Sequence, residues 1–178
     1  MRVLGAEDLA VELPGPPPAR AVQGVSFSLE AGGALAIVGE SGAGKSTVLL
    51  AIAALLPAGA RVSGRLEVAG CDVAAAPEAD VAALRGRKVG VVFQDPLGAL
   101  DPVCRVEAQV ADAIRAHRPG VDPRREAQRW LERVGLPDRG RAYPHELSGG
   151  ERQRAHLAAA LAPAPALDRK STRLNSSH

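Results

Sequence analysis

The sequence predicts an α/β fold, in which strands alternate with helices and one segment is entirely helical. Two short segments, 34–38, which is apolar throughout, and 88–93, which is apolar after Lys88, are typical of strands that are buried on both faces of a parallel sheet. After Pro96 the apolar residues recur with a helical period instead. The composition agrees with a globular domain, since 46% of the 178 residues are hydrophobic and 24% are charged. Disordered and collagen-like classes are therefore excluded.

Composition also excludes several kinds of site. The two cysteines, Cys71 and Cys104, lie far apart, so neither a disulfide framework nor a structural zinc site is indicated. Aromatic residues make up only 2% of the chain, so a base-stacking nucleic-acid partner is not expected. The longest apolar run, 48–56, is far shorter than a spanning helix of about 20 residues. Early acidic residues interrupt any signal-peptide core, so a cytosolic location is expected.

The elements of the first half follow in order. Residues 3–13 predict a strand, and a proline-rich turn at 14–18 follows it. Residues 22–29 alternate apolar and polar, which predicts a half-buried strand. The buried strand 34–38 then leads through a glycine-rich turn into a helix from Lys45 to about Leu56. We further expect a strand over 62–69 with a bulge or turn at Gly64, a short helix over 80–84 and the second buried strand over 88–93.

The second half is helical. One predicted helix ends near His117, and its buried face comprises Val106, Val110, Ala113, Ile114 and His117. The next helix is capped by Asp122, has Pro123 at its first position and ends before Gly135. Its buried stripe comprises Ala127, Trp130, Leu131 and Val134. Ser148 opens a last helix that runs to about Leu161.

The strongest chemical signal lies between the strand 34–38 and the helix that begins at Lys45. Residues 39–47, GESGAGKST, fit the pattern G-x-x-x-x-G-K-[ST]. Its glycines let backbone N–H groups turn inward around an anion, toward which the helix N-terminus also points. Lys45 can reach the β- and γ-phosphates of a nucleoside triphosphate, and the Ser46 hydroxyl can bind Mg²⁺. The alternative is a structural turn with a surface lysine, but the flanking strand and helix favour the nucleotide site.

A second motif, LSGGERQR, occupies residues 147–154. Ser148 and Glu151 form the S-x-x-E pattern of a helix capping box, and the two glycines ease a tight entry into the helix. The same helix N-terminus also exposes N–H donors to an anion. The two interpretations are compatible.

These motifs resemble those of the ATP-binding cassette (ABC) ATPases. Residues 147–154 resemble the ABC signature, and Gln94 in VFQDP resembles the Q-loop, although it could also be a polar residue that merely ends a strand. With the phosphate loop, three motifs stand in the family's order over essentially residues 1–167. The segments GESGAGKS, VFQDPLGALDPV and YPHELSGGERQR most resemble the subunits that drive peptide and nickel importers.

The resemblance implies a P-loop NTPase with a RecA-like core, an antiparallel β subdomain and an inserted helical subdomain. The ABC domain would span 1–167, with 1–96 and 155–167 as nucleotide-binding core and 97–154 as the helical subdomain. ATP and Mg²⁺ would be the cofactors, with Ser46 and Gln94 at the metal and Gln94 as the catalytic sensor. The phosphate-loop residues that would bind ATP are Gly39, Glu40, Ser41, Gly42, Ala43, Gly44, Lys45, Ser46 and Thr47. Ser148, Gly149 and Gly150 would contact the γ-phosphate of an ATP held by a facing subunit.

The function implied is ATP binding and hydrolysis that powers solute import. The expected partners are a second ATPase subunit (identical or a paralogue), membrane permease subunits and, indirectly, an extracytoplasmic solute-binding protein. The chain would sit peripherally on the cytoplasmic face of the inner membrane. Two alternatives stay open: an ABC ATPase outside transport, acting on ribosomes, DNA or cluster assembly, and a non-enzymatic fragment that binds nucleotide.

The sequence also departs from the family. An acidic strand ending in Asp-Glu is expected soon after Leu161, but Asp168 follows a short apolar run and Arg169 stands where Glu is required. The Walker B carboxylates and the switch histidine are therefore not expected in this chain. Near the end of the first strand, Leu13 stands where the family places an aromatic that stacks on adenine.

Residues 168–178, DRKSTRLNSSH, differ in composition from the rest and account for the formal net charge of +2. They resemble a translated sequencing adapter, so our hypothesis is a non-native tail after Leu167; a genuine polar tail is the alternative. On this hypothesis the domain is incomplete at its C-terminus and lacks a central strand. We then expect no stable, active ATPase from the chain as written.

Overall fold

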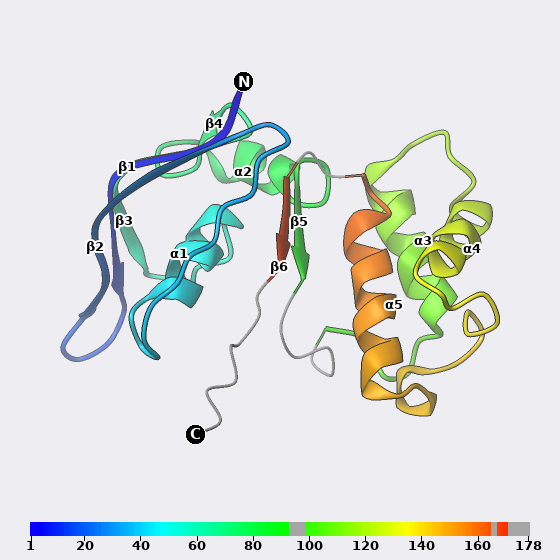
Figure 1. Ribbon diagram of the computed structural model, residues 1–178. Coiled ribbons are helices and arrows are strands. Elements are labelled where there is room, and N and C mark those ends of the chain that lie inside the picture. Colours follow the sequence, from blue (N-terminus) through cyan, green and yellow to red (C-terminus); the bar gives the residue numbers. More distant parts are fainter. Residues whose placement is uncertain (93–98, 165–166, 171–178) are drawn as a thin grey trace. The chain divides into compact units, whose positions relative to one another are not determined.

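The computed structural model describes residues 1–92, 99–164 and 167–170 (Figure 1). The chain divides into two compact units, Met1–Arg85 and Gly86–His178. The first unit is mainly a β-sheet, and the second is mainly helical. Within the described ranges, no helix is both long enough and apolar enough to cross a membrane.

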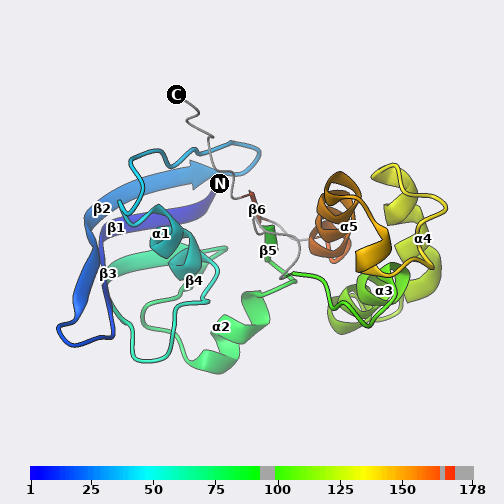
Figure 2. The same cartoon turned by 90° about the horizontal axis from the view of Figure 1, so that it is seen from below.

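The first unit is built on a four-stranded antiparallel sheet with the order β2-β1-β3-β4. The strands are β1 (Arg2–Leu13), β2 (Ala19–Glu30), β3 (Arg61–Val68) and β4 (Cys71–Asp72). Helix α1 (Lys45–Ile52) lies against β2 and β3 on one face of the sheet, and α2 (Glu78–Leu84) follows β4 (Figure 2). The predicted strands 3–13 and 62–69 are thus confirmed, and the predicted strand 22–29 is longer than expected. The core comprises Leu4, Ala6, Leu9, Val11, Val22, Val48, Ile52, Leu66 and Val68.

A β-bulge interrupts the pairing of β1 with β3 between Glu7 and Ala10. The register passes from Glu7 opposite Arg65 to Ala10 opposite Ser63, so β1 holds one extra residue. Asp8 and Gly64 both have positive φ there, 48° and 81°. A Cβ on Gly64 would lie 2.3 Å from the Asp8 carbonyl oxygen, so only glycine fits. The bulge predicted at Gly64 is therefore confirmed, with the extra residue on the neighbouring strand.

The second unit packs three helices around an apolar core. They are α3 (Val106–His117), α4 (Pro123–Arg133) and α5 (Gly149–Leu161), preceded by β5 (Val89–Val92) and followed by β6 (Leu167–Lys170). A 3-10 turn, η1 (Pro144–Glu146), leads into α5. The fully buried members of the core are Val106, Val110, Ile114, Ala127, Leu131, Ala155, Ala158 and Ala162. Arg118 ties the helix ends together, since it donates to Glu126 Oε1 at 3.1 Å and to the Ala162 carbonyl at 3.2 Å.

The predicted helix caps are confirmed, and the predicted stripes need small corrections. Asp122 accepts hydrogen bonds from the N–H groups of Arg124 and Arg125, as a cap should. On α3, Ala111 is buried together with the predicted Val106, Val110 and Ile114. The other two predicted residues, Ala113 and His117, are only half-buried. On α4, Trp130 and Val134 are partly buried at the edge of the core. Periodicity alone cannot rank residues that lie at the border of a buried face.

One buried titratable group lies on α5. His156 is 7% exposed and hydrogen-bonds the backbone of Val91 in β5. Burial lowers the pKa of His156 more than this hydrogen bond raises it. The neutral imidazole is therefore favoured at physiological pH.

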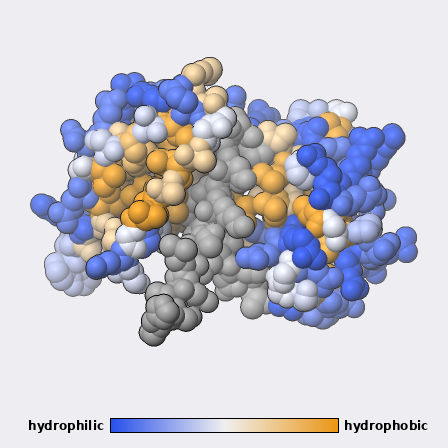
Figure 3. Space-filling view, viewed as in Figure 1, coloured by the Kyte–Doolittle hydropathy of each residue, from blue (hydrophilic) through white to orange (hydrophobic). Residues whose placement is uncertain are grey.

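The predicted buried strand at 34–38 is wrong. The segment forms no helix and no strand pairing with any described residue, and Leu35 and Val38 are 42% and 77% exposed. An apolar run becomes a buried strand only where neighbouring strands supply backbone partners and cover both faces. Instead, Ile37 and Val38 line a hollow together with Val48 of α1. Figure 3 shows a hydrophobic patch on the surface of the first unit. The helix after this segment also ends early, at Ile52, because Ala54 takes a positive φ of 54°.

The expectation that no strand follows the last helix is also wrong. Strand β6 pairs in parallel with β5, from Val89 opposite Leu167 to Val92 opposite Lys170. Parallel pairing uses backbone N–H and C=O groups, which polar residues also possess, so it needs no apolar pattern. The small number of apolar residues before Asp168 was therefore not a sufficient reason to predict that no strand forms there. The assignment of 168–178 as a non-native tail stays a prediction.

Candidate functional site

The phosphate loop closes on its own lysine. Lys45 is the first residue of α1, and its Nζ donates to the carbonyls of Gly39 at 2.9 Å and Glu40 at 2.5 Å. The Ala43 N–H donates to the Glu40 carbonyl at 3.2 Å, which makes a turn at the centre of the loop. The ammonium group thus lies across residues 39–44 rather than extending into solvent. A phosphate that enters the loop would meet this cation at once.

The last glycine of the loop fits tightly against β2. Gly44 is the residue before α1, with φ of 79°, and a Cβ there would lie 2.1 Å from the Ala21 carbonyl oxygen. Gly42 also has a positive φ, 84°, but a Cβ there would meet no atom within 4 Å. Both glycines supply a backbone conformation, and only Gly44 also supplies a close approach.

We expect Gly44→Ala to weaken ATP binding about tenfold or more, because the loop must leave β2 to accommodate the methyl group. Gly32→Ala is the matched control, since Gly32 has a φ of 78°, would have no atom within 4 Å of a Cβ and lies outside the phosphate loop. Titration of fluorescent ATP into both variants, with thermal unfolding in parallel, measures the difference. Equal affinities of the two variants would contradict the structural role of Gly44.

The loop fits a phosphate group. The space over Gly42 is open, and the first turn of α1 carries the exposed hydroxyl of Ser46 and the half-buried Thr47. Open N–H groups at a helix N-terminus, beside a lysine, form an anion site. Gln94, the second expected Mg²⁺ ligand and the catalytic sensor, lies outside the described residues. The metal assignment of Ser46 and Gln94 therefore stays a prediction.

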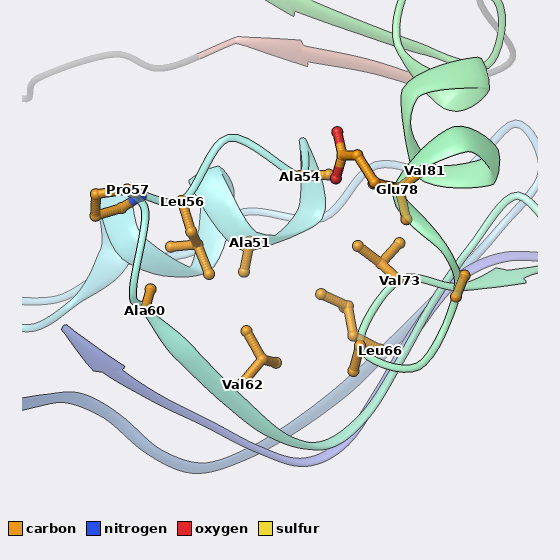
Figure 4. A pocket seen from close by; sticks show the side chains of 12 residues that line it. Ala51, Ala54, Leu56, Pro57, Ala60, Val62, Leu66, Val73, Glu78 and Val81 are labelled. Atoms are coloured by element: carbon orange, nitrogen blue, oxygen red, sulfur yellow. The ribbon is translucent and has the colours of Figure 1, made fainter. Parts of the chain in front are cut away.

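Among the described residues, the first unit has a hollow at the phosphate loop and another beside α1. One of about 480 Å³ adjoins the phosphate loop and is lined by Lys45, Gly42 and Ala43 together with Arg20, Gln23 and Phe27 of β2. The other, of about 210 Å³, has walls from the end of α1, from β3 and from the start of α2 (Figure 4). Glu78 supplies the charged side chain among its lining residues, and this carboxylate pairs with Arg85 at 2.5 Å. The hollow at the loop is the one that a nucleotide bound to Lys45 would enter.

The signature segment forms a capped helix start. Ser148 Oγ accepts from the Glu151 N–H at 3.3 Å, and Glu151 Oε2 accepts from the Ser148 N–H at 2.8 Å. These bonds from Ser148, together with Arg139, lower the pKa of Glu151 to about 2. A Cβ on Gly149 would meet nothing within 4 Å, and one on Gly150 would meet only Arg154 Nη1 at 3.7 Å. The cap is confirmed, and the glycine backbone beside it is open to a ligand.

Two arginines support this helix start: Arg152 belongs to the signature motif, whereas Arg139 lies outside it and carries no recognisable sequence signal. Arg139 Nε donates to Glu151 Oε1 at 3.0 Å across twelve positions. Arg152 Nε donates to the Pro144 carbonyl at 2.6 Å, which fixes η1 to the first turn of α5. The ring of Tyr143 stacks on His145, with centroids 5.6 Å apart. Only the folded turn between α4 and α5 brings these groups together.

The structure thus groups the site residues that the sequence predicts into two sets. Residues 39–47 form one loop in the first unit, and Ser148, Gly149 and Gly150 form one helix start in the second. The family model described as ABC transporter matches residues 22–167.

The chain belongs to the ABC transporter family.

Relatives in this family carry the names of peptide transport subunits. The chain is 44% identical over 156 residues to the oligopeptide transport ATP-binding protein OppD of Mycobacterium tuberculosis, covering 84% of this chain and 26% of that protein. It is 37% identical over 171 residues to OppD of Escherichia coli, covering 93% of this chain and 51% of that protein. The dipeptide transport protein DppD of Lactococcus lactis is 39% identical, with 82% and 44% covered. The chain thus spans about a quarter to a half of the length of these relatives.

Solved ABC structures share the fold. The dimeric ATP-binding cassette MJ0796 bound to ADP and Pi superposes with a TM-score of 0.80 at 25% identity, covering 91% of this chain and 70% of that one. CbiO1 from Clostridium perfringens gives a TM-score of 0.73 at 26% identity, with 92% and 62% covered. The predicted α/β P-loop NTPase fold is therefore confirmed for this ABC chain. The boundaries predicted within it, 1–96, 97–154 and 155–167, stay predictions.

Proposed function

We propose that this chain is the ATP-binding part of a subunit that powers an ABC importer for peptides. The observation that supports the proposal most is the phosphate loop closed on Lys45, in a chain whose relatives are named as peptide transport proteins. ATP would be the nucleotide and Mg²⁺ its counterion, held at Ser46 and Gln94. An importer for nickel is the alternative, because the specificity for the solute lies in partner proteins and not in this chain.

The loop and the signature would act on different molecules of ATP. In our proposal, residues 39–47 of one chain bind the phosphates, and Ser148, Gly149 and Gly150 of a facing subunit close on the γ-phosphate. The open backbone over Gly149 supports this, because a phosphate can approach it directly. Two chains, identical or paralogous, would thus sandwich two nucleotides head to tail.

A role in transport also implies membrane permease subunits and a solute-binding protein as partners. Permease subunits would receive the segment 97–154, and an extracytoplasmic solute-binding protein would act through them. The chain would then lie peripherally on the cytoplasmic face of the inner membrane. Turnover by the 178-residue chain is expected to be slow, because Arg169 stands where the family requires the catalytic glutamate. ATP-driven pairing of two chains is therefore a more direct measure of the proposed function than ATP hydrolysis.

We expect Ser148→Arg to leave ATP binding by the single chain unchanged but to prevent ATP-driven pairing. The arginine side chain would fill the space that the facing nucleotide must enter. Analytical ultracentrifugation with and without MgATP measures pairing, and fluorescent ATP measures binding. Ala116→Arg is the control, since it adds the same charge at an exposed position of α3. Undiminished pairing by Ser148→Arg would contradict the sandwich.

A further inference from the structure

A carboxylate lies next to the backbone that the proposed function assigns to the γ-phosphate. The Glu151 side chain is 18% exposed and holds the Ser148 N–H at 2.8 Å. Its pKa is lowered to about 2, so it is negatively charged at neutral pH. An uncompensated carboxylate at this place would repel an incoming phosphate.

Arg139 supplies the compensating charge. It lies outside the signature, in the turn after α4, and its Nε contacts the second oxygen of Glu151 at 3.0 Å. We propose that Arg139 is a positioning residue of the signature site, which neutralises Glu151 and holds it on Ser148 so that a nucleotide phosphate can bind. This inference rests on the proposed function.

The cap leaves Ser148 ready to donate. Its Oγ already accepts the Glu151 N–H at 3.3 Å, so the hydroxyl hydrogen is available to a phosphate oxygen. Both carboxylate oxygens of Glu151 are engaged, one by the Ser148 N–H and the other by Arg139. The carboxylate is therefore fixed in rotation as well as neutralised.

Arg139 is itself held in place by the N-terminus of α3. Its carbonyl accepts the Ala142 N–H at 3.1 Å. The Ala142 carbonyl accepts the Val106 N–H at 3.0 Å, and the Gly140 carbonyl accepts the Glu107 N–H at 2.9 Å. The turn thus caps α3 while it presents the guanidinium group to α5. An arginine that is fixed by its backbone loses less freedom when it pairs than one on a free loop.

The test is Arg139→Ala in the full chain. ATP binding by the single chain should be unchanged, because the phosphate loop is untouched. ATP-driven pairing should weaken about threefold at each of two equivalent signature sites, and so about tenfold in the dimer Kd. Carbon NMR of Glu151 should show its pKa rising from about 2 toward the ordinary value.

Two further variants separate charge compensation from a structural role. Arg139→Ala combined with Glu151→Gln should restore pairing to within about twofold, since the amide oxygen still accepts the Ser148 N–H without the charge. Arg129→Ala is the matched control: its pair with Glu126 has exposed fractions of 58% and 18%, against 53% and 18% for Arg139 and Glu151. It should leave pairing unchanged.

The outcomes are distinct. Unchanged pairing by Arg139→Ala, or failure of Glu151→Gln to restore it, would overturn the role of Arg139 and leave the proposed function standing. Absence of ATP-driven pairing in the unsubstituted chain would overturn both.

Discussion

Lys45→Ala is expected to weaken ATP binding by about 100-fold, since it removes two charge-assisted phosphate contacts of about 1.5 kcal/mol each. The Lys45 ammonium already lies over the loop, 2.9 Å from the Gly39 carbonyl. It can therefore turn from carbonyl to phosphate oxygens with little movement of its stem. Without it, the carbonyls of Gly39 and Glu40 would face the phosphates with no cation between them.

The measurement is a titration with fluorescent ATP in the presence of Mg²⁺. Lys88→Ala is the control, because Lys88 is exposed and belongs to the other unit. Lys45→Arg tests geometry, since arginine keeps the charge but is longer and planar; it should restore only part of the affinity. An affinity of Lys45→Ala close to that of the unsubstituted chain would refute the assignment of the loop.

Leu131→Ala is expected to destabilise the helical unit by about 3 kcal/mol, the usual cost of truncating a fully buried leucine. Leu131 is 0% exposed and packs among the residues of α3, α4 and α5. The loss is a large part of the roughly 5–15 kcal/mol that stabilises a typical domain. The signature site should fail with it, because α5 is one wall of this core.

Urea unfolding followed by tryptophan fluorescence measures this effect selectively. Trp130 is the chain's one tryptophan and lies on α4, so its emission reports the helical unit. Val103→Ala is the control: it also truncates an aliphatic side chain, but Val103 is 78% exposed. Its effect should stay below about 0.5 kcal/mol. Equal losses in the two variants would show that Leu131 is not a core residue.

Local patterns predicted the elements whose partners lie nearby in sequence. Asp122 and Pro123 place the start of α4 because capping is decided within one turn. The strand 34–38 was predicted wrongly because pairing depends on distant segments, about which an apolar run contains no information. The strand β6 was missed for the complementary reason, since a polar segment can still pair through its backbone.

In the candidate site, too, the residues within one short segment were predictable and the contacts between distant segments were not. The residues of 39–47 and 147–154 were found because a motif contains its ligands in one stretch of chain. The support from Arg139 was not predictable, because it reaches Glu151 across twelve positions through a turn of irregular geometry. The contact of Gly44 with Ala21 was not predictable either, since its reason lies in a neighbouring strand.

The bulge between β1 and β3 limits which changes of length this chain can accept. Before it, Leu4 and Ala6 point into the core; after it, Leu9 and Val11 do, so the extra residue shifts the alternation from even to odd positions. Deletion of Asp8 would remove the bulge and restore a simple alternation, so Leu9 and Val11 would still face the core, whereas a deletion elsewhere in β1 would turn side chains to the opposite face. In a sequence alignment, a one-residue gap at Asp8 would therefore signal a β1 strand that has lost its bulge, whereas a gap elsewhere along the strand would signal a changed register.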